Sequence, residues 1–257
     1  MEQTCKNCGH NFTKNYCNNC GQKAGVPRFT FRHIFDEAFH AFTHADKSLL
    51  TFARKLVIDP GGVAREYIIE EKRKKYFNPF TFFLLSTAIS GFIEGMDLNL
   101  KENLFHFNNE YGHIFNVYSK FLYLVLIPIF ALATWLLHLR KPRLLYSEYT
   151  VYAMMIVSVF NIVEFFSHII NYCFTALLKS PVEIGENIVF VIIFALYIAY
   201  ADTRFHKNFQ KPSWVKGFAS GISFFIVETA VGIFVIYALF NNFQGLGRVD
   251  FFGIRIH

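Results

Sequence analysis

The chain has 257 residues, of which 53% are apolar and only 17% are charged, and its mean hydropathy is +0.30. A soluble domain of this size does not need so many apolar residues, so composition argues against a soluble globular protein and favours a helical membrane protein. The formal net charge of +6 fits basic residues that orient membrane helices and meet anionic headgroups, so no nucleic-acid partner is expected.

The first 25 residues contain two Cys-x-x-Cys-Gly motifs, with eight residues between the inner cysteines. The expected metal ligands are Cys5, Cys8, Cys17 and Cys20. Two residues between the cysteines of each pair let both sulfurs face one ion, and the following glycine permits the turn that brings amides toward them. Four thiolates predict one structural Zn2+ in a closed tetrahedral site, within a cytoplasmic head over residues 1–25. So short a segment cannot bury a useful core, so the metal must supply its folding free energy.

Two alternatives to the four-cysteine zinc site remain open at this stage. One is a redox Cys-x-x-Cys pair, which would normally begin a helix in a βαβ context that the surrounding residues do not offer. The other replaces one cysteine ligand by His10. A cytoplasmic head lies in a reducing compartment, where a zinc site is expected rather than disulfides.

Residues 28–77 have apolar side chains at helical spacing and predict an amphipathic helical collar on the cytoplasmic membrane face. One helix is expected over Phe31–Phe42, a second after Asp46 and a third over about Val63–Tyr76, with a break at residues 59–62. The membrane-surface basic residues are Lys72, Arg73, Lys74 and Lys75. The alternative is a small cytoplasmic helical layer packed on the membrane spans, and both arrangements can hold.

Five apolar stretches follow, and they predict an all-α polytopic protein with a five-helix transmembrane bundle over residues 78–240. The spans are expected at about 80–95, 121–139, 149–173, 188–201 and 217–240. Asn78-Pro79 fits the start of the first span, because proline is tolerated in the first helical turn. The first and fourth stretches are short, so tilting, local thinning of the bilayer or a re-entrant path is an alternative for either.

The distribution of lysine and arginine fixes the expected orientation. With the N-terminus inside, the inner segments hold 20 of the 25 basic residues and the outer segments hold five. Short loops rich in these residues stay cytoplasmic. We therefore expect a multi-pass protein of a bacterial cytoplasmic membrane, with a cytoplasmic N-terminus and a C-terminal tail, residues 241–257, outside.

Two runs of sequence carry a resemblance to a known family. One is Tyr16-Cys-Asn-Asn-Cys-Gly-Gln22, and the other is Pro60-Gly-Gly-Val-Ala-Arg-Glu-Tyr-Ile68, which leads through the basic residues to Asn78-Pro79-Phe80. Together they resemble the bacterial zinc-ribbon membrane proteins of domain-of-unknown-function family 3667, over roughly residues 1–95. The resemblance implies a zinc-ribbon membrane protein and no mechanism. The topology is also loosely similar to that of Yip1-like membrane proteins, which is an analogy only.

Ionisable groups at membrane depth are candidates for function because they are costly to bury there. The expected intramembrane polar cluster consists of Asn161, Glu164, His168 and Glu228. Glu164 and His168 are four residues apart and share one helix face. If the third and fifth spans pack together, the cluster predicts proton transfer or binding of a cation or polar headgroup. The alternative is that these groups only hold helices together.

Small residues on the fifth span, with Gly217 and Gly221 four apart, indicate close helix packing first and homo-oligomerisation second. No P-loop, nucleophile elbow, His-Glu-x-x-His or dinucleotide fingerprint is present. The expected function is therefore non-enzymatic, in membrane organisation or as a scaffold whose zinc head docks a cytoplasmic partner. The alternatives are a small transporter or channel that uses Glu164, His168 and Glu228, and a membrane-embedded enzyme acting on lipid.

Overall fold

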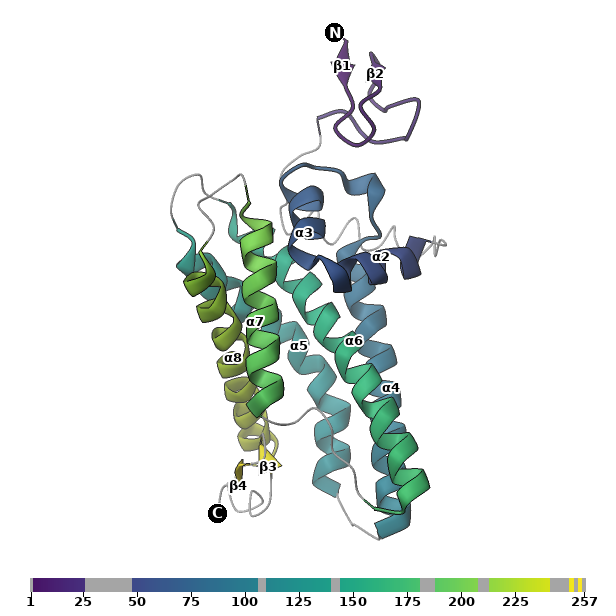
Figure 1. Ribbon diagram of the computed structural model, residues 1–257, viewed down its shortest axis with the longest axis vertical. Helices are drawn as coiled ribbons and strands as arrows, with labels where there is room; N and C mark the ends of the chain where they lie inside the picture. Colours follow the sequence, from purple (N-terminus) through teal and green to yellow (C-terminus); the bar gives the residue numbers. More distant parts are fainter. Residues whose placement is uncertain are drawn as a thin grey trace.

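The computed structural model describes residues 2–25, 48–105, 110–139, 144–180, 188–207, 213–240, 250–251 and 254–255. Figure 1 shows the cysteine-rich head at one end, two short helices beneath it and a bundle of long helices extending away from them. The helix expected over Phe31–Phe42 lies outside the described residues. So does most of the predicted tail, from which the structure describes only the strand pair β3 (Asp250–Phe251) and β4 (Ile254–Arg255).

Two short helices connect the head with the bundle, and their bounds differ from the sequence-based prediction. Helix α2 covers Ser48–Ile58 and α3 covers Pro60–Ile68. The expected break at residues 59–62 is only a corner at Asp59, whose side-chain Oδ1 accepts a hydrogen bond from the Gly62 amide at 2.9 Å. This N-cap lets Pro60 and both glycines join the first turn of α3, because proline is well suited to that turn.

Helix α3 also ends earlier than expected. It stops at Ile68, and Glu71 takes a left-handed backbone conformation with φ of 55°. The basic residues therefore do not continue the helix; Arg73–Lys75 form the separate 3-10 helix η1. A left-handed residue cannot continue a right-handed helix, which explains the early end.

Helix α3 packs on the bundle as a buried layer. It contacts α6 and α7, and most of its residues, from Pro60 to Ala64 together with Tyr67 and Ile68, are buried. The contact at Gly61 is especially close, since a Cβ atom there would lie 1.9 Å from the backbone oxygen of Ala201. For α3, the packed helical layer is therefore the arrangement that the structure has. Helix α2 instead leaves apolar side chains exposed, including Leu50 and Ile58.

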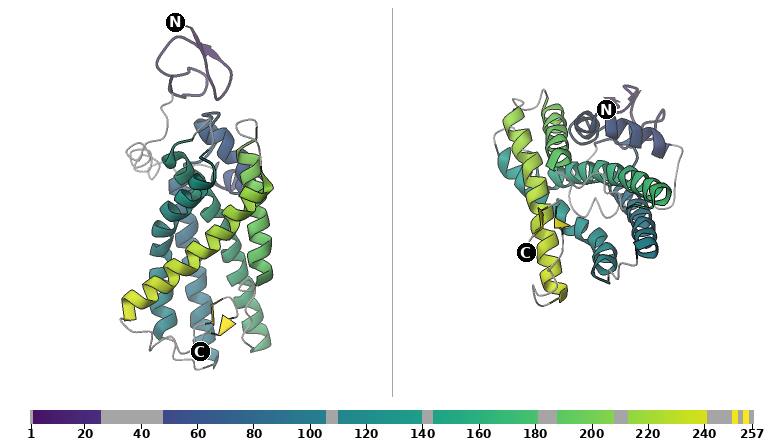
Figure 2. Two further views of the ribbon diagram at one scale, coloured as in Figure 1. Left: turned by 90° about the vertical axis from the view of Figure 1, so that its left-hand side faces the viewer. Right: turned by 60° about the horizontal axis from the view of Figure 1, so that its bottom comes forward.

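Five long helices form the bundle. They are α4 (Pro79–Phe105), α5 (Glu110–Leu137), α6 (Tyr146–Leu178), α7 (Ile188–Phe205) and α8 (Trp214–Phe240). Helix α6 lies beside α4 and α5, while α8 lies beside α5 and α7. Figure 2 shows α8 crossing the bundle obliquely. The predicted start at Asn78-Pro79 is confirmed, because Asn78 Oδ1 accepts hydrogen bonds from the amides of Phe80 and Thr81 at 3.0 and 3.1 Å.

Four stretches of the described chain are long and apolar enough to cross a membrane, judged by length and composition. They are Arg73–Phe105, Tyr146–Leu178, Ile188–Phe205 and Trp214–Ile233, while the apolar stretch Tyr123–Leu137 is shorter. These helices suggest a membrane protein. The helices around the first and third expected spans run well past their apolar parts. Helix α4 continues to Phe105 because its polar extension is satisfied internally, with Lys101 paired to Asp97 one turn away.

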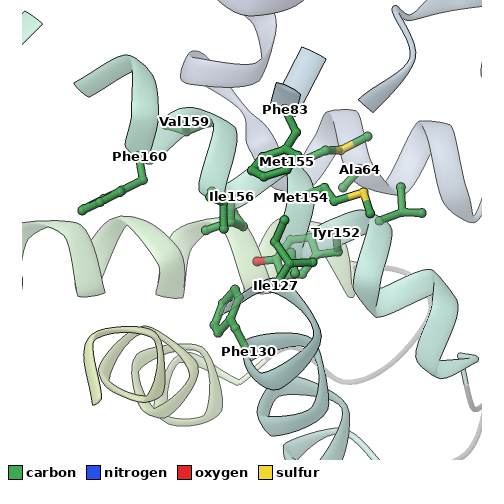
Figure 3. Packing of buried hydrophobic residues seen from close by; sticks show 14 of the residues in the cluster. Ala64, Phe83, Ile127, Phe130, Tyr152, Met154, Met155, Ile156, Val159 and Phe160 are labelled. Atoms are coloured by element: carbon green, nitrogen blue, oxygen red, sulfur yellow. The ribbon is translucent and has the colours of Figure 1, made fainter. Parts of the chain in front are cut away.

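Aromatic and aliphatic side chains from α3, α4, α5 and α6 fill the centre of the molecule. Figure 3 shows Phe83, Ile127, Phe130 and Tyr152 meeting around the buried face of α6. By contrast, many large apolar side chains elsewhere on the long helices face outward. They include Ile89, Phe92, Leu124, Val125, Leu132, Leu136, Phe166, Ile170, Ile192, Ile193, Leu196 and Ile226. A surface this apolar is expected where hydrocarbon, rather than water, is the surrounding solvent.

Helices α7 and α8 approach each other at two glycines. A Cβ atom at Gly217 would lie 2.8 Å from Ala199 Cα, and one at Gly221 would lie 2.7 Å from Ala195 Cα. Real Cβ contacts are not so short, so only glycine allows this separation of the two backbones. The predicted packing role of this pair is confirmed.

Candidate metal centre and buried polar sites

The four cysteines of the head come together as the two motifs predict. The backbone of each motif makes the same turn: Gly9 N donates to Cys5 O and Gly21 N donates to Cys17 O, both at 2.8 Å. Gly9 and Gly21 have φ values of 75° and 72°, where a side chain would be strained. The strands β1 (Gln3–Thr4) and β2 (Asn11–Phe12) pair beside the first turn.

The sulfur positions suit one metal ion. The four Sγ atoms lie within 4.8 Å of one another, with Cys5–Cys20 at 3.5 Å and Cys8–Cys17 at 3.7 Å. Sulfurs bound tetrahedrally at about 2.3 Å from zinc would be about 3.8 Å apart, whereas a disulfide requires about 2.05 Å. The cysteines are free thiols, and the group holds no histidine. This geometry fits a four-sulfur metal site, whereas His10 contacts Cys5 and Cys8 through its backbone oxygen and amide.

The environment of the thiols is uneven. The backbone amide of His10 lowers the pKa of Cys8 to about 6. Burial raises the pKa of Cys5 to about 11. A thiolate at Cys5 therefore needs a cation beside it, because burial penalises the charged form.

The head contacts the rest of the protein at Glu71 through a hydrogen bond and an ion pair. Gln22 Nε2 donates to the Glu71 backbone oxygen at 3.0 Å, and Lys6 Nζ lies 2.9 Å from Glu71 Oε2. The Gln22 side chain is almost fully buried by this contact, whereas Tyr16 remains 57% exposed on the head. The unusual backbone of Glu71 therefore coincides with the point where the metal-binding segment meets the helical layer.

The predicted basic cluster is largely neutralised by nearby carboxylates. Lys72 Nζ lies 2.7 Å from Glu70 Oε2, and Lys75 forms an ion pair with Glu66. The hydrogen bond that Lys72 donates to Glu70 raises the pKa of Lys72. Lys74 is exposed, and Arg73 is partly buried. The ion pairs of Lys72 and Lys75 therefore help to hold the loop before α4.

Another ion pair joins α3 to the end of α7. Arg204 Nη2 and Nε donate to Asp59 Oδ2 and Oδ1 at 2.6 and 3.2 Å. Burial tends to raise the pKa of Asp59, but the bonds from Arg204 and the Gly62 amide outweigh burial and lower it. Asp59 thus caps α3 and docks it on α7 at the same time.

The predicted intramembrane cluster is divided among separate partners. Asn161 Nδ2 donates to Thr87 Oγ1 on α4 at 2.8 Å. His168 Nδ1 lies 3.2 Å from Asp97 Oδ2, also on α4. The hydroxyl of Tyr123 on α5 donates to both oxygens of Glu164, at 3.1 and 3.0 Å. Asp97 and Tyr123 carry no local sequence signal that marks them as partners, because they lie on α4 and α5 and not on α6.

Glu164 and Glu228 nevertheless belong to one neighbourhood. Both lie within electrostatic range of the Tyr123 hydroxyl, as does Glu94 of α4. These residues lie near the middle of four different helices, α4, α5, α6 and α8. Three carboxyls from α4, α6 and α8 are therefore near enough to act electrostatically on Tyr123, and Glu164 accepts its hydrogen bonds.

A buried group that sequence reasoning missed lies at the end of the bundle nearest α3. It consists of His138, just after α5, together with Asp202 on α7 and His206, just after α7. One ligand-type atom from each residue lies within 4.8 Å of the others. Asp202 and His206 are four residues apart at the end of an apolar stretch, a spacing visible in the sequence. His138 has no such local signal and is brought in by the fold.

Comparison with known proteins supports the resemblance seen in the sequence. Residues 46–91 match the family described as "Protein of unknown function (DUF3667)". The matched segment contains α2, α3, η1 and the first part of α4, so it coincides with the layer that joins the head to the bundle. No curated protein and no solved structure matched the chain.

Proposed function

Because residues 46–91 place the chain with a family whose description assigns no activity, we propose a function from the geometry: a membrane scaffold whose zinc head docks a cytoplasmic partner. The observation that carries the proposal is the four-sulfur group, which is complete without an open coordination position. Such a closed site suits structure rather than catalysis. The head is held at Glu71 and leaves Tyr16 exposed.

The proposed arrangement has five membrane spans and a cytoplasmic N-terminus, in a bacterial inner membrane. Helix α5 has 28 residues, which corresponds to about 42 Å at 1.5 Å per residue and exceeds the hydrocarbon thickness of about 30 Å. Its apolar part, Tyr123–Leu137, is shorter than the other spans. The proposal that α5 also crosses the membrane therefore rests on the length of the helix and on the distribution of basic residues. The outward-facing part of α2, with Leu50 and Ile58 exposed beside Arg54 and Lys55, is proposed to lie against the cytoplasmic headgroups.

Photo-crosslinking at the head tests the docking proposal. A photoreactive residue in place of Tyr16 is expected to give a discrete protein adduct in intact cells, because this side chain is the exposed aromatic of the head. The adduct should be lost in the Cys17→Ser/Cys20→Ser double variant, which cannot fold the head. The same probe at Leu178, at the far end of α6 and 58% exposed, is the control and should give no such adduct. An adduct that persists without the cysteines, or the absence of any adduct at Tyr16, contradicts docking through a folded head.

The three carboxyls near Tyr123 favour a second candidate function, which is the transfer of protons or cations. Glu94, Glu164 and Glu228 come from three helices, and all three act electrostatically on Tyr123. Carboxyls at this depth are costly and are typical of ion or proton pathways in membrane proteins. Under this proposal Glu164 and Glu228 carry the exchangeable charge, while His168 and Asp97 form a separate pair nearer the outer end.

Neutralising these carboxyls tests the second candidate. In liposomes containing the purified protein, Glu164→Gln and Glu228→Gln should each reduce ion flux by at least about tenfold, because a loss of about 1.4 kcal/mol in binding corresponds to that factor. Ser223→Ala on α8 is the control and should leave flux unchanged. If wild-type protein carries no proton or cation flux above empty liposomes, transport is excluded and the carboxyls serve helix packing.

A further inference from the structure

We propose that His138, Asp202 and His206 bind one divalent transition-metal ion, of the Zn2+ type, which clamps the cytoplasmic ends of α5 and α7. The three residues are 5%, 1% and 1% exposed. Two imidazoles and one carboxylate within reach of one another are a ligand set used for zinc and for non-haem iron. The site is independent of the head and of the docking proposed for it.

Hydrogen bonding fixes which ring nitrogens face the centre of the group. His138 Nδ1 lies 2.9 Å from the backbone oxygen of Thr134, and His206 Nδ1 lies 2.9 Å from that of Asp202. A carbonyl oxygen only accepts hydrogen bonds, so both Nδ1 atoms carry the proton. Metal-binding histidines usually donate their second ring N–H to such a group, which leaves Nε2 as the ligand.

The short distance between His138 and Asp202 requires a positive charge between them, either a proton or a metal ion. His138 Nε2 lies 3.1 Å from Asp202 Oδ2, and with the proton on Nδ1 both atoms present lone pairs. Either a further proton or a metal ion removes this repulsion. Two ligands bound at about 2.05 Å in a tetrahedral site would be about 3.3 Å apart, which is close to the observed separation.

The other carboxylate oxygen favours the metal over the proton. Asp202 Oδ1 is buried and has no hydrogen-bond partner among the described residues. His206 Nδ1 is 3.5 Å from it, but this nitrogen already donates to the Asp202 backbone oxygen. One proton shared with His138 would satisfy only Oδ2, whereas a metal ion lies within reach of both oxygens. A buried unsatisfied carboxylate oxygen is costly, so the ion resolves both problems.

His206 completes the site after one rotation. Its ring is stacked on that of His138, with centroids 4.1 Å apart and an interplanar angle of 11°. A metal in the plane of the His138 ring is out of the plane of a parallel neighbour, so His206 must turn about its Cβ–Cγ bond, a torsion with broad minima. The turn gives up the 2.8 Å hydrogen bond between Tyr149 and His206 Nε2, and it also weakens the 2.9 Å bond from His206 Nδ1 to the Asp202 backbone oxygen. Tyr149, on α6, therefore competes with metal binding rather than supporting it.

Zinc content of the purified full-length chain tests this site. The Cys17→Ser/Cys20→Ser variant removes the head ligands and should still retain about one zinc per chain after chelation, reloading with Zn2+ and washing. Adding Asp202→Asn or His206→Gln should reduce this content to near zero. Adding Tyr149→Phe should retain it, because the competing hydrogen bond is removed. His168→Ala is the matched control, since His168 pairs with Asp97 elsewhere, and should also retain the zinc.

Cobalt provides a measurement that does not depend on variants at the site. Co2+ bound to a cysteine-free variant, in which all five cysteines are replaced by serine, should show visible d–d absorption without thiolate-to-metal charge transfer. The proposal is overturned if the cysteine-free protein, folded by circular dichroism, binds neither zinc nor cobalt. It is also overturned if Asp202→Asn and His206→Gln both fold and hold as much zinc as their parent. In either case a proton, and not a metal ion, lies between His138 and Asp202. Neither result affects crosslinking at Tyr16.

Discussion

Cys17→Ser is expected to remove the metal ion of the head and unfold residues 2–25, while the helical bundle remains folded. The head's buried apolar contacts are limited to Cys5, Cys17 and Phe12 with partly buried neighbours. Two short strands and so few apolar contacts cannot offset the conformational entropy of ordering the segment. Structural zinc sites in small domains supply about 10–16 kcal/mol at neutral pH, so the loss of one thiolate is expected to be decisive.

Metal analysis and amide hydrogen exchange of the full-length protein check this prediction together. The variant should lose one metal ion per chain, and the amides of Gly9 and Gly21, bonded to Cys5 and Cys17 carbonyls, should exchange at unprotected rates. His10→Ala is the matched control, because the His10 side chain is exposed and lies outside the metal group. A head that keeps slow exchange after the metal has been lost would show that its fold does not depend on the ion.

The segment matched by the family explains how a metal site and a bundle are joined in one chain. Residues 46–91 include Asp59, which caps α3 and binds Arg204, and Glu71, which binds Gln22 and Lys6. The same segment begins α4 with the Asn78 cap. In this chain the matched segment is therefore a connecting platform, held to the head on one side and to α7 on the other.

Local patterns made some features predictable from the sequence. The Cys-x-x-Cys-Gly motifs, the Asn78-Pro79 helix start and the Gly217/Gly221 spacing each act within one turn or one helix face, and the structure confirms the geometry expected of each. The bounds of α3 were wrong because the N-cap at Asp59 brings two glycines into the helix, and because Glu71 reverses the backbone. Propensity alone disfavours glycine in a helix, but a cap and close packing override it.

The contacts of Glu164 and His168 could not be predicted from local sequence patterns. The spacing of Glu164 and His168 indicated a shared face, yet their side chains contact Tyr123 and Asp97 on two other helices. His138 meets Asp202 only because α5 and α7 end at the same level of the bundle. Pairings of this kind depend on helix order and depth, which a single sequence does not encode in any short segment.

Gly61→Ala is expected to detach α3 from the bundle, with a loss of about 3 kcal/mol or more, at the upper end of what overpacking costs. The added Cβ would lie 1.9 Å from the Ala201 backbone oxygen and 2.7 Å from Arg204 Cβ. Backbone cannot rotate away as a side chain can, so the helices must separate. The separation would also break the Arg204–Asp59 ion pair. Thermal unfolding in detergent measures the loss, and Thr51→Ala on the exposed part of α2 should leave stability unchanged.

Gly62→Ala provides the decisive comparison, because its clash has a different origin. A Cβ at Gly62 would lie 2.2 Å from Asp59 Oδ2, and this obstacle is a side chain. Asp59→Ala removes the obstacle, so Gly62→Ala should cost clearly less in that background than in the wild type, with a coupling of about 1–2 kcal/mol. Gly61→Ala should keep most of its cost in the Asp59→Ala background, since the Ala201 oxygen remains and only the contribution of the Arg204–Asp59 ion pair is missing there. Equal costs for Gly62→Ala in the two backgrounds would show that Asp59 does not set the conformation at the start of α3.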